Sequence, residues 1–400
     1  MMMGGLWTRL FIVVMLIGVV AASRPLAFFM VGVAWVVLIG LVLYKGVYLG
    51  RYLPQFVLDR LDRRERERRE AARKEAKLTA IDADELAAKL RAKVVGQDYV
   101  IDQVARTLRR RFLARRPNKP LAVFCFAGPP GVGKTHLAKV LAETLYGDSR
   151  HLHFIDMSTA GQGHAAQTLF GSPKGYMGSD SYGQVTTALR DTPNAVMLLD
   201  EFEKADGEVH KRFLTAWNDG FVTEVSDGTK FSTAETIFVL TTNAASRRIG
   251  ELAREHTGSP EDLDRVVKSS LADAQFAPEV LSRIDEVFAF REMRGLDIAR
   301  VVVLEIEGIT KQYDLEIANA GIDPQILVDA IDKVEEPGAK GGVREISRNL
   351  ERQIADGLVD AKLAGASRVR FVPEGEKIRV IPEPDAPKPA GSPASVVTPA

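Results

Sequence analysis

Cysteine and histidine are scarce in this chain, and neither sign of charge dominates. A single cysteine, Cys125, stands among 400 residues, so no internal disulfide can form. It lies in an apolar run and is expected to be a small core residue. The six histidines include no H-E-x-x-H pattern, which excludes a zinc protease site of that type. Basic and acidic residues both number 53, so the whole chain lacks the charge excess of a nucleic-acid-binding protein.

Two long hydrophobic runs stand near the N-terminus. Residues 10–22 are apolar throughout, and residues 26–44 form a second run without a charged side chain. Because about 20 apolar residues cross a bilayer, we expect residues 1–53 to be a membrane anchor of two helices, about 6–22 and 26–44. The alternatives are a cleaved signal peptide ending near Ala22, followed by a single anchor, and a buried hairpin of a soluble protein.

Basic residues follow the second run closely and predict the orientation of the anchor. Lys45, Arg51 and Arg60 all stand just after this run, and such residues concentrate on the cytoplasmic side of a membrane. We therefore expect a protein of the bacterial inner membrane, with the rest of the chain in the cytoplasm. Residues 54–80 are densely charged, and pairs such as Glu65 and Arg69 have helical spacing, which predicts a charged helical linker.

A complete phosphate-binding pattern occupies residues 128–135. The apolar run 121–126 predicts a buried strand, a turn rich in glycine and proline follows, and residues 136–145 have helical spacing. Such a loop directs backbone N–H groups and a helix N-terminus at a polyphosphate. Lys134 is expected to reach the β- and γ-phosphates and Thr135 to bind Mg²⁺, so ATP and Mg²⁺ are the expected cofactors. The expected nucleotide-binding residues of this segment are Gly128, Pro129, Pro130, Gly131, Val132, Gly133, Lys134, Thr135 and His136.

Polar residues at the ends of two further apolar runs suit the hydrolytic half of such a site. Residues 195–199 lead to Asp200, expected to hold the metal, and to Glu201, expected to polarise the attacking water. Residues 236–240 lead to Asn243, whose amide can orient that water. Strands that alternate with helices predict an α/β fold, with a parallel sheet flanked by helices and the site at its carboxyl edge.

Five segments, in order, resemble those of the Clp-type AAA+ ATPases, the ring-forming unfoldases and disaggregases. They are residues 94–97 (V-V-G-Q), the phosphate loop 128–135, residues 169–178 (L-F-G-S-P-K-G-Y-M-G), 198–205 (L-L-D-E-F-E-K-A) and 276–285 (F-A-P-E-V-L-S-R-I-D). The resemblance covers about residues 85–381. It implies a large ATPase domain over residues 81–290 and a small, mostly helical domain over residues 291–381. Residues 382–400 are rich in proline and alanine and are expected to be a disordered tail.

The resemblance also implies roles for individual residues. Tyr176, with Met177 beside it, would project into the channel of a homohexameric ring and grip a polypeptide. The hairpin-like segment 221–231 would form a second channel loop. Arg283 would act in trans, as an arginine finger on the nucleotide of the neighbouring subunit. Val94 and Val95 would flank the adenine.

Two departures from the family pattern limit what it implies. Lys340 stands where the family has an arginine that contacts the nucleotide, and lysine lacks the fork that grips phosphate at two points. Arg344, one helical turn later, is an alternative. Residues 249–251 do not resemble the loop that docks some relatives on a peptidase ring, so a Clp peptidase is not an expected partner.

The functional prediction is a membrane-anchored ATPase without a protease domain, which unfolds, threads or remodels protein substrates at the bilayer. The alternative is an ATPase dedicated to one membrane secretion or conjugation apparatus, which would use the same chemistry on a single client. A nucleic-acid motor is disfavoured by the neutral charge and by the aromatic, rather than basic, channel segment. No nucleic-acid partner is therefore expected.

Overall fold

The computed structural model describes residues 82–114, 116, 118–161, 164–173, 181–255, 260–274, 276–336, 342–375 and 377–383. The predicted anchor and linker lie outside the described residues, as do Tyr176, Met177, Lys340 and most of the predicted tail. Among the helices of the described part, none is long and apolar enough to cross a membrane. The membrane anchor therefore stays a prediction from the sequence.

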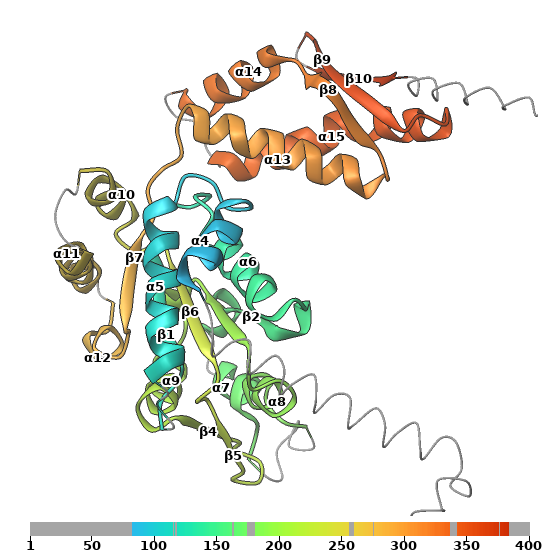
Figure 1. Ribbon diagram of the computed structural model, residues 1–400. Helices are drawn as coiled ribbons and strands as arrows, with labels where there is room; N and C mark the ends of the chain where they lie inside the picture. The colour runs from blue at the N-terminus through green and yellow to red at the C-terminus, as the bar shows by residue number, and fades with distance from the viewer. Residues whose placement is uncertain are drawn as a thin grey trace, which may run out of the picture. The chain divides into compact units, whose positions relative to one another are not determined.

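A five-stranded parallel sheet is the centre of the large domain (Figure 1). Its strand order is β2-β3-β6-β1-β7. The strands are β1 (Ala122–Ala127), β2 (Leu152–Asp156), β3 (Val196–Asp200), β6 (Ile237–Thr242) and β7 (Glu286–Ala289). Every pairing among them is parallel. The predicted parallel α/β fold is thus confirmed.

Both faces of this sheet are buried, which explains why its strands are continuous apolar runs in the sequence. In β1, Val123 and Cys125 belong to the core on one face, whereas Phe124 and Phe126 belong to the core on the other. Burial raises the pKa of the Cys125 thiol to about 12, with a further contribution from the nearby carboxylate of Glu203. The only cysteine is therefore a neutral core residue, as expected.

Helices cover the two faces of the sheet. The core on one face includes residues of α4 (Ala83–Arg91), α5 (Asp98–Ala114) and α6 (Lys134–Tyr146). The core on the other face includes residues of α7 (Ala165–Phe170), α8 (Gln184–Asp191), α9 (Gly207–Asp219), α10 (Ser246–Glu255), α11 (Pro260–Asp273) and α12 (Pro278–Leu281). Three short 3₁₀ turns complete this domain: η2 (Ser149–His151), η3 (Met157–Ala160) and η4 (Phe202–Lys204).

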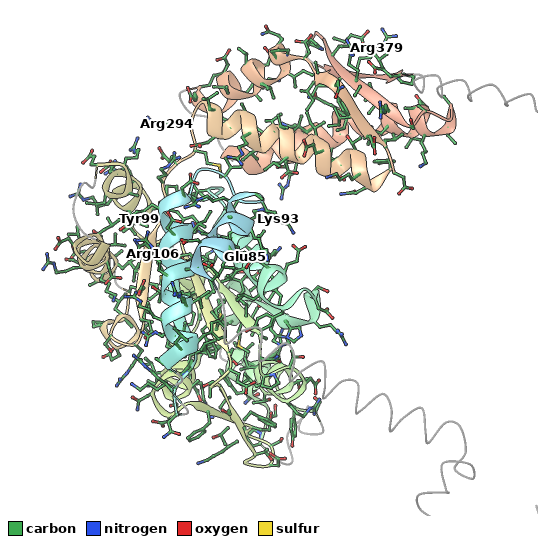
Figure 2. All side chains as sticks on the ribbon, in the orientation of Figure 1. Glu85, Lys93, Tyr99, Arg106, Arg294 and Arg379 are labelled. Carbon is green, nitrogen blue, oxygen red and sulfur yellow. The ribbon has the colours of Figure 1, made fainter. Side chains whose placement is uncertain are left out.

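Helix α4 illustrates how the polar and apolar positions divide. Leu86 and Leu90 are buried in the core, whereas Glu85 lies on the exposed side, where Lys89 forms an ion pair with it at 2.5 Å. Figure 2 shows Glu85 on α4 and Arg106 on α5, and both side chains are exposed. Most charged residues of these two helices thus face solvent, and their apolar stripes hold them on the sheet.

Residues 161–183 contain more structure than the sequence predicts. The glycine-rich composition predicts a segment poor in structure, but α7 forms at Ala165–Phe170. The reason is burial: Ala165 lies about one helical turn before Leu169 and Phe170, and all three enter the core. The prediction is therefore wrong for these six residues.

An antiparallel hairpin follows α9. Its strands are β4 (Phe221–Thr223) and β5 (Lys230–Ser232), with Phe221 opposite Ser232 and Thr223 opposite Lys230. The hairpin suggested by residues 221–231 is therefore present, and its place in a channel stays a prediction. The chain passes from it directly to β6 of the central sheet.

The C-terminal part of the chain has its own core and a second sheet. Its helices are α13 (Leu296–Gln312), α14 (Pro324–Glu335) and α15 (Gly342–Leu363), and its strands are β8 (Glu316–Ile322), β9 (Arg368–Glu374) and β10 (Lys377–Glu383). The sequence also predicts a hairpin of residues 368–372 and 377–381, and it is confirmed, because β9 pairs antiparallel with β10. Strand β8, which pairs parallel with β9, is not predicted by the sequence. Strand β10 ends at Glu383 and therefore includes the first two residues of the predicted tail.

Candidate active site

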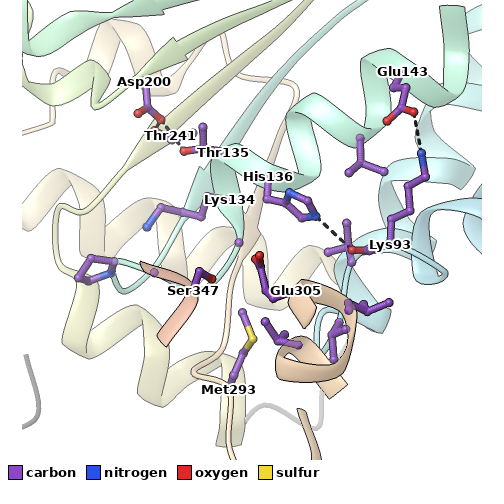
Figure 3. A pocket seen from close by; sticks show the side chains of 18 of the residues that line it. Lys93, Lys134, Thr135, His136, Glu143, Asp200, Thr241, Met293, Glu305 and Ser347 are labelled. Atoms are coloured by element: carbon purple, nitrogen blue, oxygen red, sulfur yellow. Dashed lines mark hydrogen bonds and ion pairs between the residues drawn. The ribbon is translucent and has the colours of Figure 1, made fainter. Parts of the chain in front are cut away.

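A cavity of about 730 Å³ lies at the carboxyl edge of the central sheet (Figure 3). Its lining includes Asp156 at the end of β2, Asp200 at the end of β3 with Glu201 after it, and Thr241 and Asn243 around the end of β6. The phosphate loop lines the same cavity. These five polar side chains come from three strand ends that are far apart in the sequence. They meet because the carboxyl ends of parallel strands share one edge of a sheet.

The phosphate loop holds a nearly buried cation at the start of α6. Gly133 has a left-handed backbone (φ 96°), after which the helix begins at Lys134. The Lys134 side chain is 7 % exposed, and its Nζ donates to Gly128 O at 2.6 Å, Pro129 O at 2.7 Å and Asn243 Oδ1 at 2.8 Å. An ammonium group beside a helix N-terminus and a glycine-rich loop suits an anionic ligand such as a polyphosphate.

Oxygen atoms of the kind that bind hard metal ions lie next to Lys134 in the site. The Thr135 hydroxyl donates to Asp200 Oδ1 at 2.8 Å, and the Thr241 hydroxyl donates to the same oxygen at 2.7 Å. Over the described ranges of the chain, no group of three or more His, Cys, Asp or Glu side chains could hold a metal ion. One hydroxyl and one carboxylate next to a phosphate site are a donor set that fits Mg²⁺, which takes few protein ligands and completes its shell with phosphate and water.

Glu201 is held in an unusual position. Its backbone is left-handed (φ 56°), a conformation that costs a non-glycine residue about 1–3 kcal/mol and occurs often at active sites. Its N–H donates to Thr241 Oγ1 at 3.0 Å. Its carboxylate accepts from Asn243 Nδ2 at 3.2 Å and from Lys204 Nζ at 2.6 Å. The predicted base and the predicted orienting amide are therefore in direct contact.

The opposite part of the cavity suits a nucleobase. Val94 and Val95, which the resemblance places beside the adenine, line it together with His136, Val140 and Ala92. A ring nitrogen of His136 lies 3.1 Å from Lys93 O, and Lys93 pairs with Glu143 at 2.7 Å. Met293, Val301, Leu304, Glu305 and Ser347 of the C-terminal part also line the cavity, and Figure 3 labels three of them.

The remaining predicted residues divide among the cavity lining, the core and the surface. Pro130, Gly131 and Gly133 line the cavity, whereas Val132 packs in the core. Gly128 and Pro129 act through the carbonyl groups that bind Lys134. Arg283 is exposed, and it is not among the described residues that line this cavity. Tyr176, Met177 and Lys340 lie outside the described residues.

Sequence reasoning missed three residues that organise the site. Thr241 contacts both Asp200 and Glu201. The pairing of β3 with β6 places Leu199 beside Leu240, so the residues that follow, Asp200 and Thr241, are neighbours across the two strands. Glu203 accepts the Asn243 N–H at 3.0 Å, and Gln97 donates to the carbonyls of Val132 and Arg291. Of the three, Gln97 and Glu203 lie in motifs that the sequence shows, residues 94–97 and 198–205, whereas Thr241 lies in none of them.

A protein family and several known proteins match this chain. Residues 119–287 match the family model of the AAA domain (Cdc48 subfamily). The chain is 36% identical over 278 residues to the chaperone protein ClpB of Rhodopirellula baltica, covering 69% of this chain and 31% of that relative. It is 35% identical over 296 residues to ClpB of Staphylococcus aureus, covering 73% of this chain and 33% of the relative.

A second kind of relative is the ATP-dependent Clp protease ATP-binding subunit ClpE of Bacillus subtilis. The identity is 33% over 304 residues, which covers 74% of this chain and 42% of that protein. The chain therefore spans less than half of the length of these relatives. The matched region includes the parallel sheet and the phosphate loop, and the resemblance expected from the five motifs is confirmed for it: this chain carries a Clp-type AAA+ ATPase domain.

Proposed function

We propose that the chain is a membrane-anchored AAA+ ATPase that couples ATP hydrolysis to the unfolding, threading or remodelling of protein substrates. The observation that carries the proposal is that Lys134, Asp200 and Glu201 line one cavity. The hydroxyls of Thr135 and Thr241 both donate to Asp200 and hold this arrangement together. Bound MgATP would supply the phosphoryl group and the cation that neutralises its charge. The residues of the chain would supply the remaining functions.

Each of these functions follows from a contact in the site. Lys134 would exchange its carbonyl partners, Gly128 O and Pro129 O, for phosphate oxygens, while Thr135 and Asp200 would hold Mg²⁺. Glu201 would accept the proton of the attacking water at its carboxylate. Asn243 and Lys204 each donate to one oxygen of that carboxylate, and each oxygen keeps a second acceptor site for the proton.

We propose that Arg283 serves the cavity of a neighbouring subunit in a homohexameric ring. The position of Arg283 supports this role, since the side chain is exposed after α12, away from the residues that line the cavity of its own chain. A guanidinium group supplied in trans would stabilise the charge that develops during phosphoryl transfer. Hydrolysis would then require assembly.

The names of the relatives support proteins as the substrates. One kind of relative is called a chaperone, and the other is called the ATP-binding subunit of a protease. For this chain we propose that Tyr176 contacts the polypeptide in a channel. We propose no peptidase partner, because Ile249 is buried within α10 and residues 249–251 form no exposed apolar loop.

The membrane anchor is the part of the proposal that rests on the sequence alone. The two hydrophobic runs, at residues 10–22 and 26–44, support it. We expect the full-length chain to stay in the membrane fraction after alkaline carbonate extraction and to leave it after detergent is added. Release by carbonate alone would contradict the anchor, and an N-terminus that begins after Ala22 in the mature protein would favour a cleaved signal peptide.

A mixture of two inactive variants tests whether Arg283 acts in trans. Arg283→Ala and Glu201→Gln should each lower ATP turnover by about 10³-fold. In an equal mixture, roughly a quarter of the subunit boundaries in random rings would combine an intact Glu201 with an intact Arg283 from the neighbour, so turnover should return in part. An Arg283→Ala variant with undiminished turnover, or co-assembled mixed rings without activity, would contradict the proposal.

The Tyr176→Ala variant tests whether hydrolysis serves threading. ATP turnover should stay within about two-fold of the parent, while unfolding of a fluorescent substrate protein should fall by at least about ten-fold, because only the contact with the polypeptide is lost. Phe154→Ala is the matched control, since Phe154 is an aromatic residue on β2 that is 44% exposed. Equal loss in both variants, or unfolding that persists in Tyr176→Ala, would contradict the threading proposal.

A further inference from the structure

A buried carboxylate outside the nucleotide site has no role in the chemistry proposed so far. Glu224 follows β4 directly and is 0% exposed. Its Oε1 accepts the N–H of Ser226 at 3.0 Å and the Ser226 hydroxyl at 2.9 Å. Its Oε2 accepts the N–H of Gly183 at 3.0 Å and the hydroxyl of Thr186. Four neutral donors therefore surround one buried carboxylate.

These donors stabilise the ionised form of Glu224. Burial raises the pKa of the carboxyl group, but the hydrogen bonds from Thr186, Ser226 and Gly183 outweigh this effect, and the pKa lies below its usual value. Removing a buried carboxylate that accepts several hydrogen bonds leaves its donors unsatisfied, which is costly. An amide at this position cannot accept all four bonds, because its nitrogen is a donor. The ionised carboxylate is thus the group that this site requires.

Glu224 contacts both ends of the segment that contains Tyr176. Gly171 has a left-handed backbone (φ 91°), and a Cβ there would lie 1.5 Å from Glu224 Oε1. A Cβ at Gly183 would lie 2.4 Å from the backbone nitrogen of Gly171. The absence of side chains at these two positions lets the ends of the segment touch. The carboxylate lies against both ends.

Further contacts join the same two ends to the β4–β5 hairpin. On the N-terminal side, the Val225 N–H donates to Phe170 O at 3.0 Å. On the C-terminal side, the Tyr182 hydroxyl donates to Asp227, and the Tyr182 ring packs on Phe231 with 5.7 Å between centroids. Figure 1 shows α7, α8 and the hairpin gathered at one end of the large domain, where α8 contacts β5.

The joined elements lead to two strands of the nucleotide site. Helix α8 precedes β3, after which Glu201 stands, and the hairpin precedes β6, which leads to Asn243. Glu201 and Asn243 contact each other. A rearrangement of the contact between Glu201 and Asn243 would therefore act on both α8 and the β4–β5 hairpin. Glu224 joins the same two elements at a second place, because it accepts hydrogen bonds from Thr186 of α8 and from Ser226.

We propose that Glu224 is a positioning residue that fastens the described residues 171–173 and 181–183 to the β4–β5 hairpin, so that these parts move together. We call Glu224 with Gly183, Thr186 and Ser226 the Glu224 clamp. The consequence for function rests on the proposed role of Tyr176 in threading. With the clamp intact, movement at the ends of β3 and β6 reaches the residues around Tyr176 and the β4–β5 hairpin together. Without the clamp, ATP hydrolysis continues but moves the substrate less effectively.

The Glu224→Gln variant tests the clamp, with Glu235→Gln as the matched control. Glu235 is an exposed carboxylate in the connection between β5 and β6, so the chemical change is the same and the clamp is untouched. We expect Glu224→Gln to keep ATP turnover within about two-fold and to lower the substrate unfolded per ATP consumed by about ten-fold. Glu235→Gln should behave as the parent. If Glu224→Gln melts below the assay temperature, Ser226→Ala, which removes one donor, should show a smaller loss in the same ratio.

A distance measurement distinguishes the clamp from the threading proposal. Spin labels at Pro173→Cys and Thr229→Cys, both exposed positions, report on the segment and the hairpin, and the neutral, buried Cys125 stays unlabelled. The distance distribution should be narrow in the labelled parent and in Glu235→Gln and broad in Glu224→Gln. A narrow distribution in Glu224→Gln, or an unchanged unfolding ratio while Tyr176→Ala loses unfolding, would overturn the clamp. If the Tyr176→Ala variant unfolds substrate normally, the threading proposal is wrong, and the distances between the spin labels alone test the clamp.

Discussion

The carboxylate of Asp200 holds the nucleotide site together. One of its oxygens accepts the hydroxyl of Thr135 from the phosphate loop and the hydroxyl of Thr241 from β6. Asp200 itself ends β3, so a single oxygen atom joins three segments that are far apart in the sequence. The proposed Mg²⁺ ligands, the Lys134 ammonium group and the predicted base all depend on the mutual position of these segments.

The hydroxyl of Thr241 extends this constraint to Glu201. It donates to Asp200 and also accepts the N–H of Glu201, whose backbone is left-handed. Strained backbone of this kind persists only where its surroundings determine it. The buried Phe202, which follows directly, contacts His210, Phe213, Trp217 and Phe276 and provides that support from the core. The aromatic core on one face of the sheet thus helps to hold Glu201, the predicted base, at its edge.

The sequence predicted the parts of the site that depend on local chemistry. The phosphate loop is recognisable because glycines, Lys134 and Thr135 stand at fixed spacing, and the central strands because both of their faces are buried. Thr241 was missed because its role follows from the register between β3 and β6, which no local pattern encodes. Glu224 was missed for a similar reason: a carboxylate in a polar hairpin is usually solvated, and only the fold shows that this one is buried.

The same limit applies to two elements of secondary structure. Helix α7 is short and has glycines around it, so burial, rather than helix propensity, decides its conformation. Strand β8 alternates weakly between buried and exposed residues and depends on its partner β9.

Replacement of Thr241 tests most directly whether the Asp200 network organises the site. Thr241→Val removes both hydrogen bonds at nearly constant volume. Thr242→Val is the control, because Thr242 is also buried and also accepts a backbone N–H, that of Ala244. ATP turnover, measured over a range of Mg²⁺ concentrations, should fall by about 10–100-fold in Thr241→Val, with a raised Mg²⁺ requirement, and should change little in Thr242→Val. Equal turnover in the two variants, at the same Mg²⁺ requirement, would contradict the account.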